Sequence, residues 1–169
     1  MALVVAGCGD DKEESSENLN PGTGQTTSST AGGAPGECKT EGTTTASAAE
    51  EVVLTLGEFT IKASKQPKAG DVSIKAENSG AEKHEVVIVK GDNAEGLPKD
   101  ADGGLDESKL PEGALIGEIE EFASGQVCTG TYNLTAGKYV LLCNITETEP
   151  DGTKESHFKE GMHTPFTVS

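Results

Sequence analysis

The sequence predicts an all-β protein, an antiparallel β-sandwich of seven or eight short strands that follows a long N-terminal linker. Two observations lead to this fold. From about residue 52 onward, short apolar or alternating runs recur between turn-forming residues, and no stretch has the apolar spacing of a helix. Between Asp10 and Glu50 the chain is instead rich in Gly, Ser and Thr and has no apolar periodicity.

The first eight residues combine a short apolar run with Ala6-Gly7-Cys8. This arrangement resembles a bacterial lipobox, in which the cysteine after the cleavage site carries lipid. A complete signal peptide has a basic start and a longer apolar stretch, so the resemblance implies a truncated signal over residues 1–8. We therefore expect Cys8 to be lipidated and the protein to be extracytoplasmic, anchored to the bacterial cell membrane on its periplasmic or cell-surface side.

The predicted linker covers residues 9–50 and is expected to be disordered. Leu19 is the only large aliphatic residue between Asp10 and Glu50. A random coil of this length spans roughly 35 Å. The folded domain is then expected over residues 52–169, which is enough chain for one hydrophobic core.

The expected strands follow one another along this domain. Alternating apolar and polar residues predict half-buried strands at 59–63 and 72–76. Continuous apolar runs at 85–90 and 138–143 predict strands in the centre of the sandwich. A final strand alternates around Phe166 and Val168. Further strands are expected at 52–56, 115–119 and 127–134.

The composition excludes several function classes. Acidic residues outnumber basic ones 29 to 13, and the formal charge is −16. Nucleic-acid binding needs a basic surface, which this chain cannot assemble. An acidic surface suits docking onto a basic patch of a partner protein. The sequence contains no Gly-x-Ser-x-Gly, P-loop or His-Glu-x-x-His motif, and we do not expect an enzyme.

Four residues with metal-binding side chains lie at the ends of predicted strands. His84 begins one central strand, Cys143 ends another, and His157 and Met162 precede the last strand. Two imidazoles and a thiolate, with a weak axial thioether, are the ligands of a blue copper site. Soft sulfur suits copper(I) and imidazole also binds copper(II), so such a site can change oxidation state with little rearrangement.

Three segments, NSGAEKHEVV, GKYVLLCN and HFKEGMHTPFTV, resemble the cupredoxin family of plastocyanin- and azurin-like blue copper proteins. The resemblance covers about residues 52–169 and implies a Greek-key sandwich. It also implies that one type 1 copper ion is bound by His84, Cys143, His157 and Met162.

The same resemblance implies a route for electrons. In the family, the histidine of the C-terminal loop lies near the surface, and here that residue is His157. Its neighbours Phe158, Pro165 and Phe166 are then expected to form a small apolar docking patch. The acidic residues between Cys143 and His157 are expected to select partners with a basic docking patch.

Two features depart from the pattern of the family. Thirteen residues separate Cys143 from His157, where most cupredoxins have only a few. We expect them to form a polar surface excursion with a turn at residues 149–152; if the excursion displaces His157, His163 is the substitute imidazole. Glu85 stands where many relatives have asparagine, and we expect it to shift the reduction potential.

The cysteines allow two disulfide pairings. A bond between Cys38 and Cys128 would join the linker to the domain and leave Cys143 free. A bond between Cys128 and Cys143 would be a structural bridge and leave Cys38 unpaired. The sequence alone does not choose between them.

Together these inferences predict a monomeric, membrane-tethered blue copper protein that carries single electrons between redox protein partners by outer-sphere transfer. One alternative is a copper storage or delivery protein that uses the same ligands. The other is a metal-free, Ig-like surface binding module with a disulfide between Cys128 and Cys143.

Overall fold

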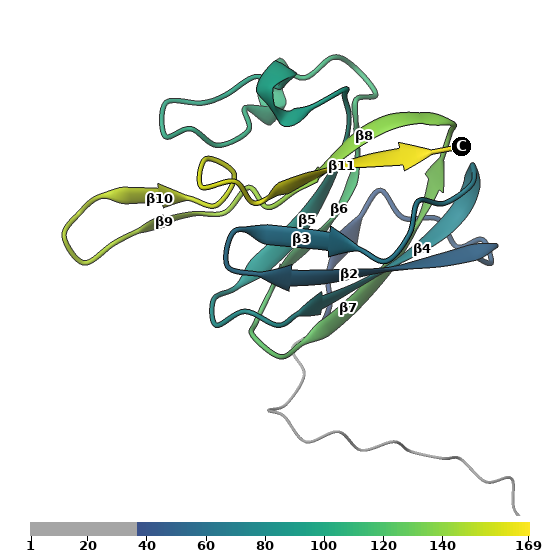
Figure 1. Cartoon of the computed structure of the whole chain (residues 1–169), viewed down its shortest axis with the longest axis horizontal. Coiled ribbons are helices and arrows are strands. Elements are labelled where there is room, and N and C mark those ends of the chain that lie inside the picture. Colours follow the sequence, from purple (N-terminus) through teal and green to yellow (C-terminus); the bar gives the residue numbers. More distant parts are fainter. Residues whose placement is uncertain (1–36) are drawn as a thin grey trace, which may run out of the picture. The chain divides into compact units, whose positions relative to one another are not determined.

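The computed structural model describes residues 37–169, which form two β-sheets packed face to face (Figure 1). Eight strands build this sandwich: β2 (Glu50–Gly57), β3 (Thr60–Ala63), β4 (Gly70–Asn78), β5 (His84–Lys90), β6 (Leu115–Phe122), β7 (Val127–Leu134), β8 (Gly137–Leu142) and β11 (His163–Val168). Three shorter strands are added to them: β1 (Thr40–Glu41), β9 (Thr146–Thr148) and β10 (Lys154–Ser156). Two 3-10 turns lie at Ala94–Gly96 and Glu107–Lys109.

The eight expected strands are therefore present, and the predicted Greek-key sandwich is confirmed. One sheet has the order β3-β2-β4-β7 and the other β1-β6-β5-β8-β11. The strand directions differ from the expectation at one place, because β2 and β4 pair in parallel. β3 folds back as a hairpin along one edge of β2, so the chain crosses over and β4 runs beside the other edge in the direction of β2.

The hydrophobic core follows directly from the sequence patterns. Alternating residues of β2 and β4 point inward and are buried, as the period of a half-buried strand predicts. The continuous apolar run of β5 is buried on both faces. Val86 and Ile88 face the main core between the sheets, whereas Val87 and Val89 face a second cluster under residues 94–114. This second cluster includes Phe158, which directly follows His157.

The body of the domain begins earlier than the expected linker boundary at residue 50. Cys38 forms a disulfide with Cys128, and β1 pairs with β6. The amide of Thr44 also donates to the carbonyl of Thr131 at 2.8 Å. These contacts attach residues 37–50 to the sandwich although they have no apolar pattern. The lipobox, Cys8 and residues 9–36 of the linker lie outside the described residues.

A close approach of two backbones sets the position of β1. A Cβ atom on Gly117 would lie 2.3 Å from the carbonyl oxygen of Glu41 and 2.9 Å from the ring of Tyr132. We expect Gly117→Ala to lower the free energy of unfolding by about 1–3 kcal/mol, measured by urea denaturation. Gly96→Ala is the control, because its Cβ would lie 3.4 Å from its nearest neighbour. Equal urea midpoints for Gly117→Ala and Gly96→Ala would contradict the view that the close backbone approach at Gly117 fixes β1.

No helix among residues 37–169 is long and apolar enough to cross a membrane.

Candidate metal centre

Three residues that can bind a metal ion meet at one end of the sandwich. His84 is the first residue of β5, and Cys143 directly follows β8. Because β5 and β8 are antiparallel neighbours, the start of one lies beside the end of the other. His157 directly follows β10 and completes the group. All three residues have no exposed surface.

The distances between the donor atoms fit a single bound ion. Nδ1 of His84 lies 3.3 Å from Nδ1 of His157, and that nitrogen lies 3.4 Å from Sγ of Cys143. Nitrogen ligands at about 2.0 Å from a trigonal metal lie roughly 3.5 Å apart. Two imidazole nitrogens and one sulfur also form the donor set that copper prefers. The residues present therefore fit a copper ion between them.

The outer nitrogens of both imidazoles face carboxylates. Nε2 of His157 lies 3.5 Å from Oε2 of Glu82, and Nε2 of His84 lies 4.0 Å from Oε1 of Glu58. Both nitrogens and Oε2 of Glu82 are buried without a hydrogen-bond partner. When Nδ1 binds a metal, Nε2 carries the proton and can donate it to the carboxylate. Metal binding at Nδ1 of His157 would thus let its Nε2 donate to Oε2 of Glu82, whereas the 4.0 Å between His84 and Glu58 is too long for a hydrogen bond.

The loop before His84 is shaped to admit these groups. A Cβ atom on Gly80 would lie 2.5 Å from Oε1 of Glu58 and 2.8 Å from Nε2 of His84, so only glycine leaves room for both. Asn78 holds the loop by accepting from the amide of Gly80 and donating to the carbonyl of Glu82.

His157 is buried, and the expectation that it lies near the surface was wrong. The ring of Phe59 contacts it edge-on, with 5.4 Å between the ring centroids. Phe59 has a φ of 55°, a left-handed conformation that costs a non-glycine residue roughly 1–2 kcal/mol. This conformation, in the tight turn between β2 and β3, places the ring over the imidazole.

The expected apolar docking patch is absent as well. Phe158 and Phe166 are buried, with exposed fractions of 2% and 1%, because Phe158 packs into the second cluster and Phe166 into the main core. Of the three residues assigned to the patch, only Pro165 is exposed.

The residues between Cys143 and His157 form a hairpin that leaves the site and returns to it. Strands β9 and β10 pair in antiparallel fashion and project from the sandwich (Figure 1). The turn at residues 149–152 closes with a bond from the amide of Gly152 to the carbonyl of Glu149. The amide of His157 then donates to the carbonyl of Ile145 at 2.9 Å. The excursion therefore does not displace His157.

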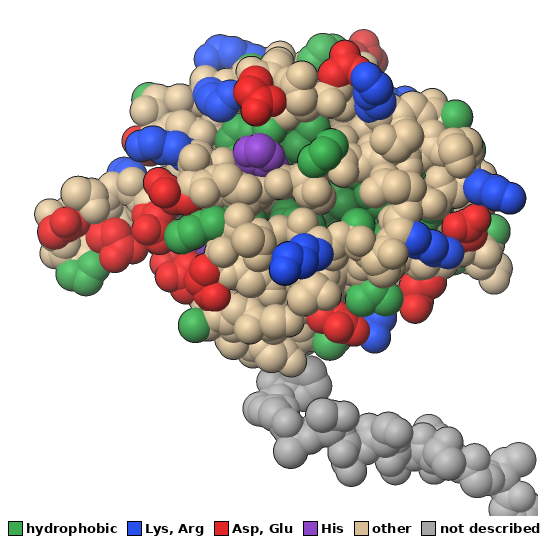
Figure 2. Space-filling model, in the orientation of Figure 1, with side chains coloured by type: hydrophobic (Ala, Val, Ile, Leu, Met, Phe, Trp, Pro, Cys, Tyr) green, Lys and Arg blue, Asp and Glu red, His purple; other side chains and the backbone are tan. Residues whose placement is uncertain are grey.

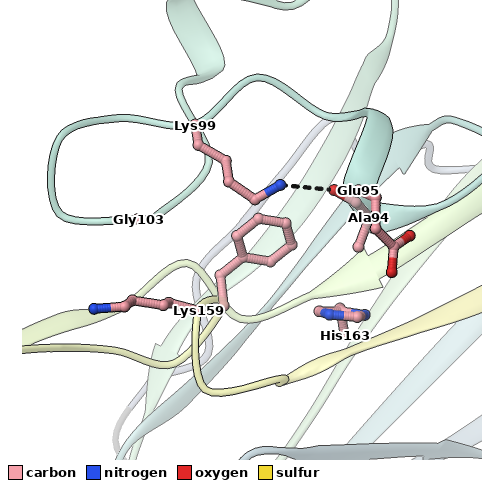
Figure 3. A pocket seen from close by; sticks show the side chains of 7 residues that line it. Ala94, Glu95, Lys99, Gly103, Lys159 and His163 are labelled. Atoms are coloured by element: carbon pink, nitrogen blue, oxygen red, sulfur yellow. Dashed lines mark hydrogen bonds between the residues drawn. The ribbon is translucent and has the colours of Figure 1, made fainter.

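His163 lies outside the three-residue group. Its ring packs at 5.4 Å from the ring of Phe158 and lines a surface pocket (Figure 3). Met162, by contrast, is fully buried in the same cluster as Cys143. Its amide donates to the carbonyl of His157 at 2.8 Å, and its carbonyl accepts from the amide of Cys143 at 3.0 Å. Backbone bonds thus connect Met162 to two of the three grouped residues.

Comparisons with known proteins show which fold this chain has. No protein-family model matches the sequence, and no curated protein matches it. Among solved structures, auracyanin B is similar with a TM-score of 0.52 and 16% sequence identity, over 78% of this chain and 97% of that one. The chain has the cupredoxin fold.

Two other solved structures are also similar to this cupredoxin domain. The auracyanin from the photosynthetic bacterium Roseiflexus castenholzii, reduced with dithionite, has a TM-score of 0.46 and 22% identity, over 73% of this chain and 99% of that one. Auracyanin A is a "blue" copper protein from the green thermophilic photosynthetic bacterium Chloroflexus aurantiacus. It has a TM-score of 0.44 and 21% identity, over 70% of this chain and 99% of that one.

The thiol of the cupredoxin domain is free. Cys38 pairs with Cys128, so the structure contains the first of the two pairings considered and not the bridge between Cys128 and Cys143. Burial raises the pKa of Cys143 to about 12, although the amides of Glu85 and Ile145 favour the thiolate. An ion that binds here must therefore displace the thiol proton, which selects metals with high affinity for sulfur. Burial and the nearby His157 lower the pKa of His84, which keeps its imidazole neutral and able to bind metal.

Glu85 links the centre to the segment beside it. Its carboxylate accepts from the amide of Asn144 at 2.8 Å, and the Asn144 side chain bonds both backbone groups of Leu105. Burial nevertheless raises the pKa of Glu85 to about 7. The neutral carboxyl is therefore the form that the metal-free fold favours.

The stability of the metal-free cupredoxin domain should depend on Glu85. Because the pKa of Glu85 is raised on folding, its contribution is complete below pH 4.5 and is lost as the pH rises through about 7. Between pH 5 and 8 we expect the free energy of unfolding to fall by about 2–3 kcal/mol more in the wild type than in Glu85→Gln, measured by urea denaturation. The exposed Glu112→Gln is the control and should behave like the wild type. If the free energy of unfolding changed with pH in the same way in the wild type and in Glu85→Gln, Glu85 would not be the group that causes the pH dependence.

Sequence reasoning missed Phe59, Glu58 and Glu82, the residues that cover the two imidazoles. Glu58 and Phe59 belong to a two-residue turn far from the predicted ligands in sequence. Glu82 lies two residues before His84, but one glutamate in so acidic a chain carries no signal.

Proposed function

We propose that the protein is a type 1 copper protein, tethered to a membrane by lipid on Cys8, that carries single electrons between redox partners by outer-sphere transfer. Copper is bound by His84, Cys143 and His157, with Met162 as the weak axial ligand. The observation that supports this most is a free, buried thiol 3.4 Å from Nδ1 of His157, which in turn lies 3.3 Å from Nδ1 of His84. Copper supplies a reversible one-electron couple in such a ligand set.

The residues of this chain perform the other tasks. Two central strands and the backbone bonds of the 157–162 loop fix the ligands, so little rearrangement accompanies a change in oxidation state. The side chain of Phe59 and the main core, which includes Cys143 and Met162, exclude water from the donor atoms. Three histidines in the chain, with two in this centre, leave too few for the additional copper sites of a copper oxidase. This supports a carrier rather than an enzyme.

Glu82 should influence the reduction potential through His157. Its negative charge near the imidazole stabilises copper(II) over copper(I). Glu82→Gln removes that charge, and we expect the reduction potential to rise by tens of millivolts in cyclic voltammetry. Glu112→Gln lies on an exposed turn and should leave the potential unchanged. A potential that falls, or that changes equally in both variants, would contradict the role of Glu82.

The acidic surface favours a partner with a basic docking patch. Acidic side chains gather on the projecting hairpin and its surroundings (Figure 2). Glu147 and Glu155 lie directly opposite each other in β9 and β10, and the carboxylate of Glu155 lies within 4.8 Å of Glu82 and His157. Like charges in this position repel, and a cationic partner surface relieves that repulsion. A monomer on a lipid anchor outside the cytoplasm could use this face to meet a neighbouring redox protein.

Electron transfer and copper delivery make different predictions for the same ligands. We would reduce and reoxidise the copper-loaded protein repeatedly in the presence of a copper(I) chelator and measure the copper retained. A carrier keeps its copper and shows a reversible one-electron couple. A delivery protein transfers copper(I) to the chelator after the first reduction, and this result would refute the proposal.

A further inference from the structure

A pocket of about 330 Å³ opens beside the proposed copper centre (Figure 3). Its apolar floor is formed by Phe158 and Ala94, which belong to the second hydrophobic cluster. Lys99, Lys159 and His163 surround the floor, and Glu95 lies at one side. His163 is the only histidine of the chain with exposed surface. The pocket therefore combines an aromatic floor with side chains that can donate hydrogen bonds to an anion.

The charge of this pocket is opposite to that of the protein. The chain has a formal charge of −16, yet two lysines and one imidazole line this pocket with a single carboxylate, and the ammonium of Lys159 points outward from it (Figure 3). Within residues 37–169, neither Lys99 nor Lys159 forms an ion pair with a carboxylate. The ammonium of Lys99 lies 5.5 Å from the centroid of the Phe158 ring and donates one bond to the carbonyl of Ala94. Its remaining N–H groups are free to bind a carboxylate from outside.

A short path of bonds connects the pocket to the proposed ligand sulfur. The amide of Cys143 donates to the carbonyl oxygen of Met162 at 3.0 Å, and that carbonyl carbon is bonded to the nitrogen of His163. About eight covalent bonds and one hydrogen bond thus lead from the sulfur to the imidazole of His163. His157 offers no comparable route, because Phe59 and Glu82 cover it and it has no exposed surface.

We infer that this pocket is a second docking surface, which binds carboxylates on an acidic redox partner and exchanges electrons through His163. This inference rests on the proposed function. One electron passes from the partner to copper(II), and the partner is oxidised by one electron without transfer of atoms. The carrier would then use two surfaces of opposite charge, the acidic hairpin face for one partner and the lysine pocket for the other.

Anion binding can be tested without any redox chemistry. Hexacyanochromate(III) is an inert, paramagnetic trianion that broadens NMR signals of nearby nuclei. We would add it to the metal-free and the copper(I)-loaded full-length protein, labelled with nitrogen-15. The inference predicts broadening around Lys99, Lys159 and His163 in both forms, and loss of this broadening in the Lys99→Glu/Lys159→Glu variant. Broadening centred elsewhere would overturn the docking surface.

Electron exchange is tested by oxidation of the copper(I) protein with ferricyanide at low ionic strength. We expect Lys99→Glu/Lys159→Glu to slow this reaction about five- to ten-fold through loss of electrostatic attraction. Lys62→Glu/Lys65→Glu changes the net charge equally, in β3 and just after it, away from the pocket, and serves as the matched control. His163→Ala should also slow the reaction, with the visible absorption and the reduction potential unchanged. Equal slowing in the matched control, or no effect of His163→Ala, would overturn the inferred route.

The two tests also separate this inference from the proposed function. A protein that binds hexacyanochromate in the pocket but takes up no copper would confirm the anion site and refute the electron carrier. If the protein binds copper but the pocket interacts with neither hexacyanochromate nor ferricyanide, the proposed function stands and the second docking surface is refuted.

Discussion

Cys143→Ser is expected to abolish the visible absorption of the copper-loaded protein and to lower its affinity for copper by more than about 100-fold. The absorption of a blue copper site arises from charge transfer between thiolate and copper, and a serine hydroxyl cannot replace it. Serine is only slightly smaller than cysteine, so it still fills the fully buried position of Cys143. Visible spectroscopy and competition with a copper chelator measure the two effects.

The control for this variant is His163→Ala. His163 lies outside the group formed by His84, Cys143 and His157, so its removal should leave the visible band and the affinity intact. If Cys143→Ser kept the band, or if His163→Ala lost it, the assignment of the ligands would be wrong. Urea denaturation of both metal-free variants verifies that each remains folded.

The double variant Cys38→Ala/Cys128→Ala is expected to lower the free energy of unfolding by about 4–5 kcal/mol in the chain-entropy description of disulfides. The bond spans 90 residues and therefore removes much of the conformational freedom of the unfolded chain. It also attaches the segment before β2 to β7. Urea denaturation of the metal-free protein measures the loss.

Reduction of the wild type provides an independent control for the same bond. With dithiothreitol present, the wild type should lose a similar amount of stability, whereas the double variant should not change. A loss below about 1 kcal/mol in the double variant would show that the pairing contributes little to the fold.

The strands of the sandwich were predictable because their signal is local. Alternation in β4 and the continuous apolar run of β5 report how many faces of each strand are buried. The parallel pairing of β2 with β4 was not predictable in this way, because it depends on which edge of β2 the hairpin to β3 occupies. The two residues of β1 carry no pattern at all, and a disulfide holds them in place.

The metal centre was predictable from order and chemistry, and its surroundings were not. His84, Cys143 and His157 were identified because imidazole and thiol side chains at strand ends are rare in this chain. The burial of His157 depends on Phe59, whose left-handed conformation occupies a turn where glycine or asparagine is usual. Cysteine counting could not select a disulfide, because the choice depends on where the chain enters the sandwich.

The most direct test of the account is the visible absorption spectrum of the full-length protein after copper(II) is added and the excess removed. We predict a strong thiolate-to-copper band in the visible range and one copper ion per chain. A colourless protein that retains no copper, with the thiol of Cys143 still free, would contradict the proposed copper centre.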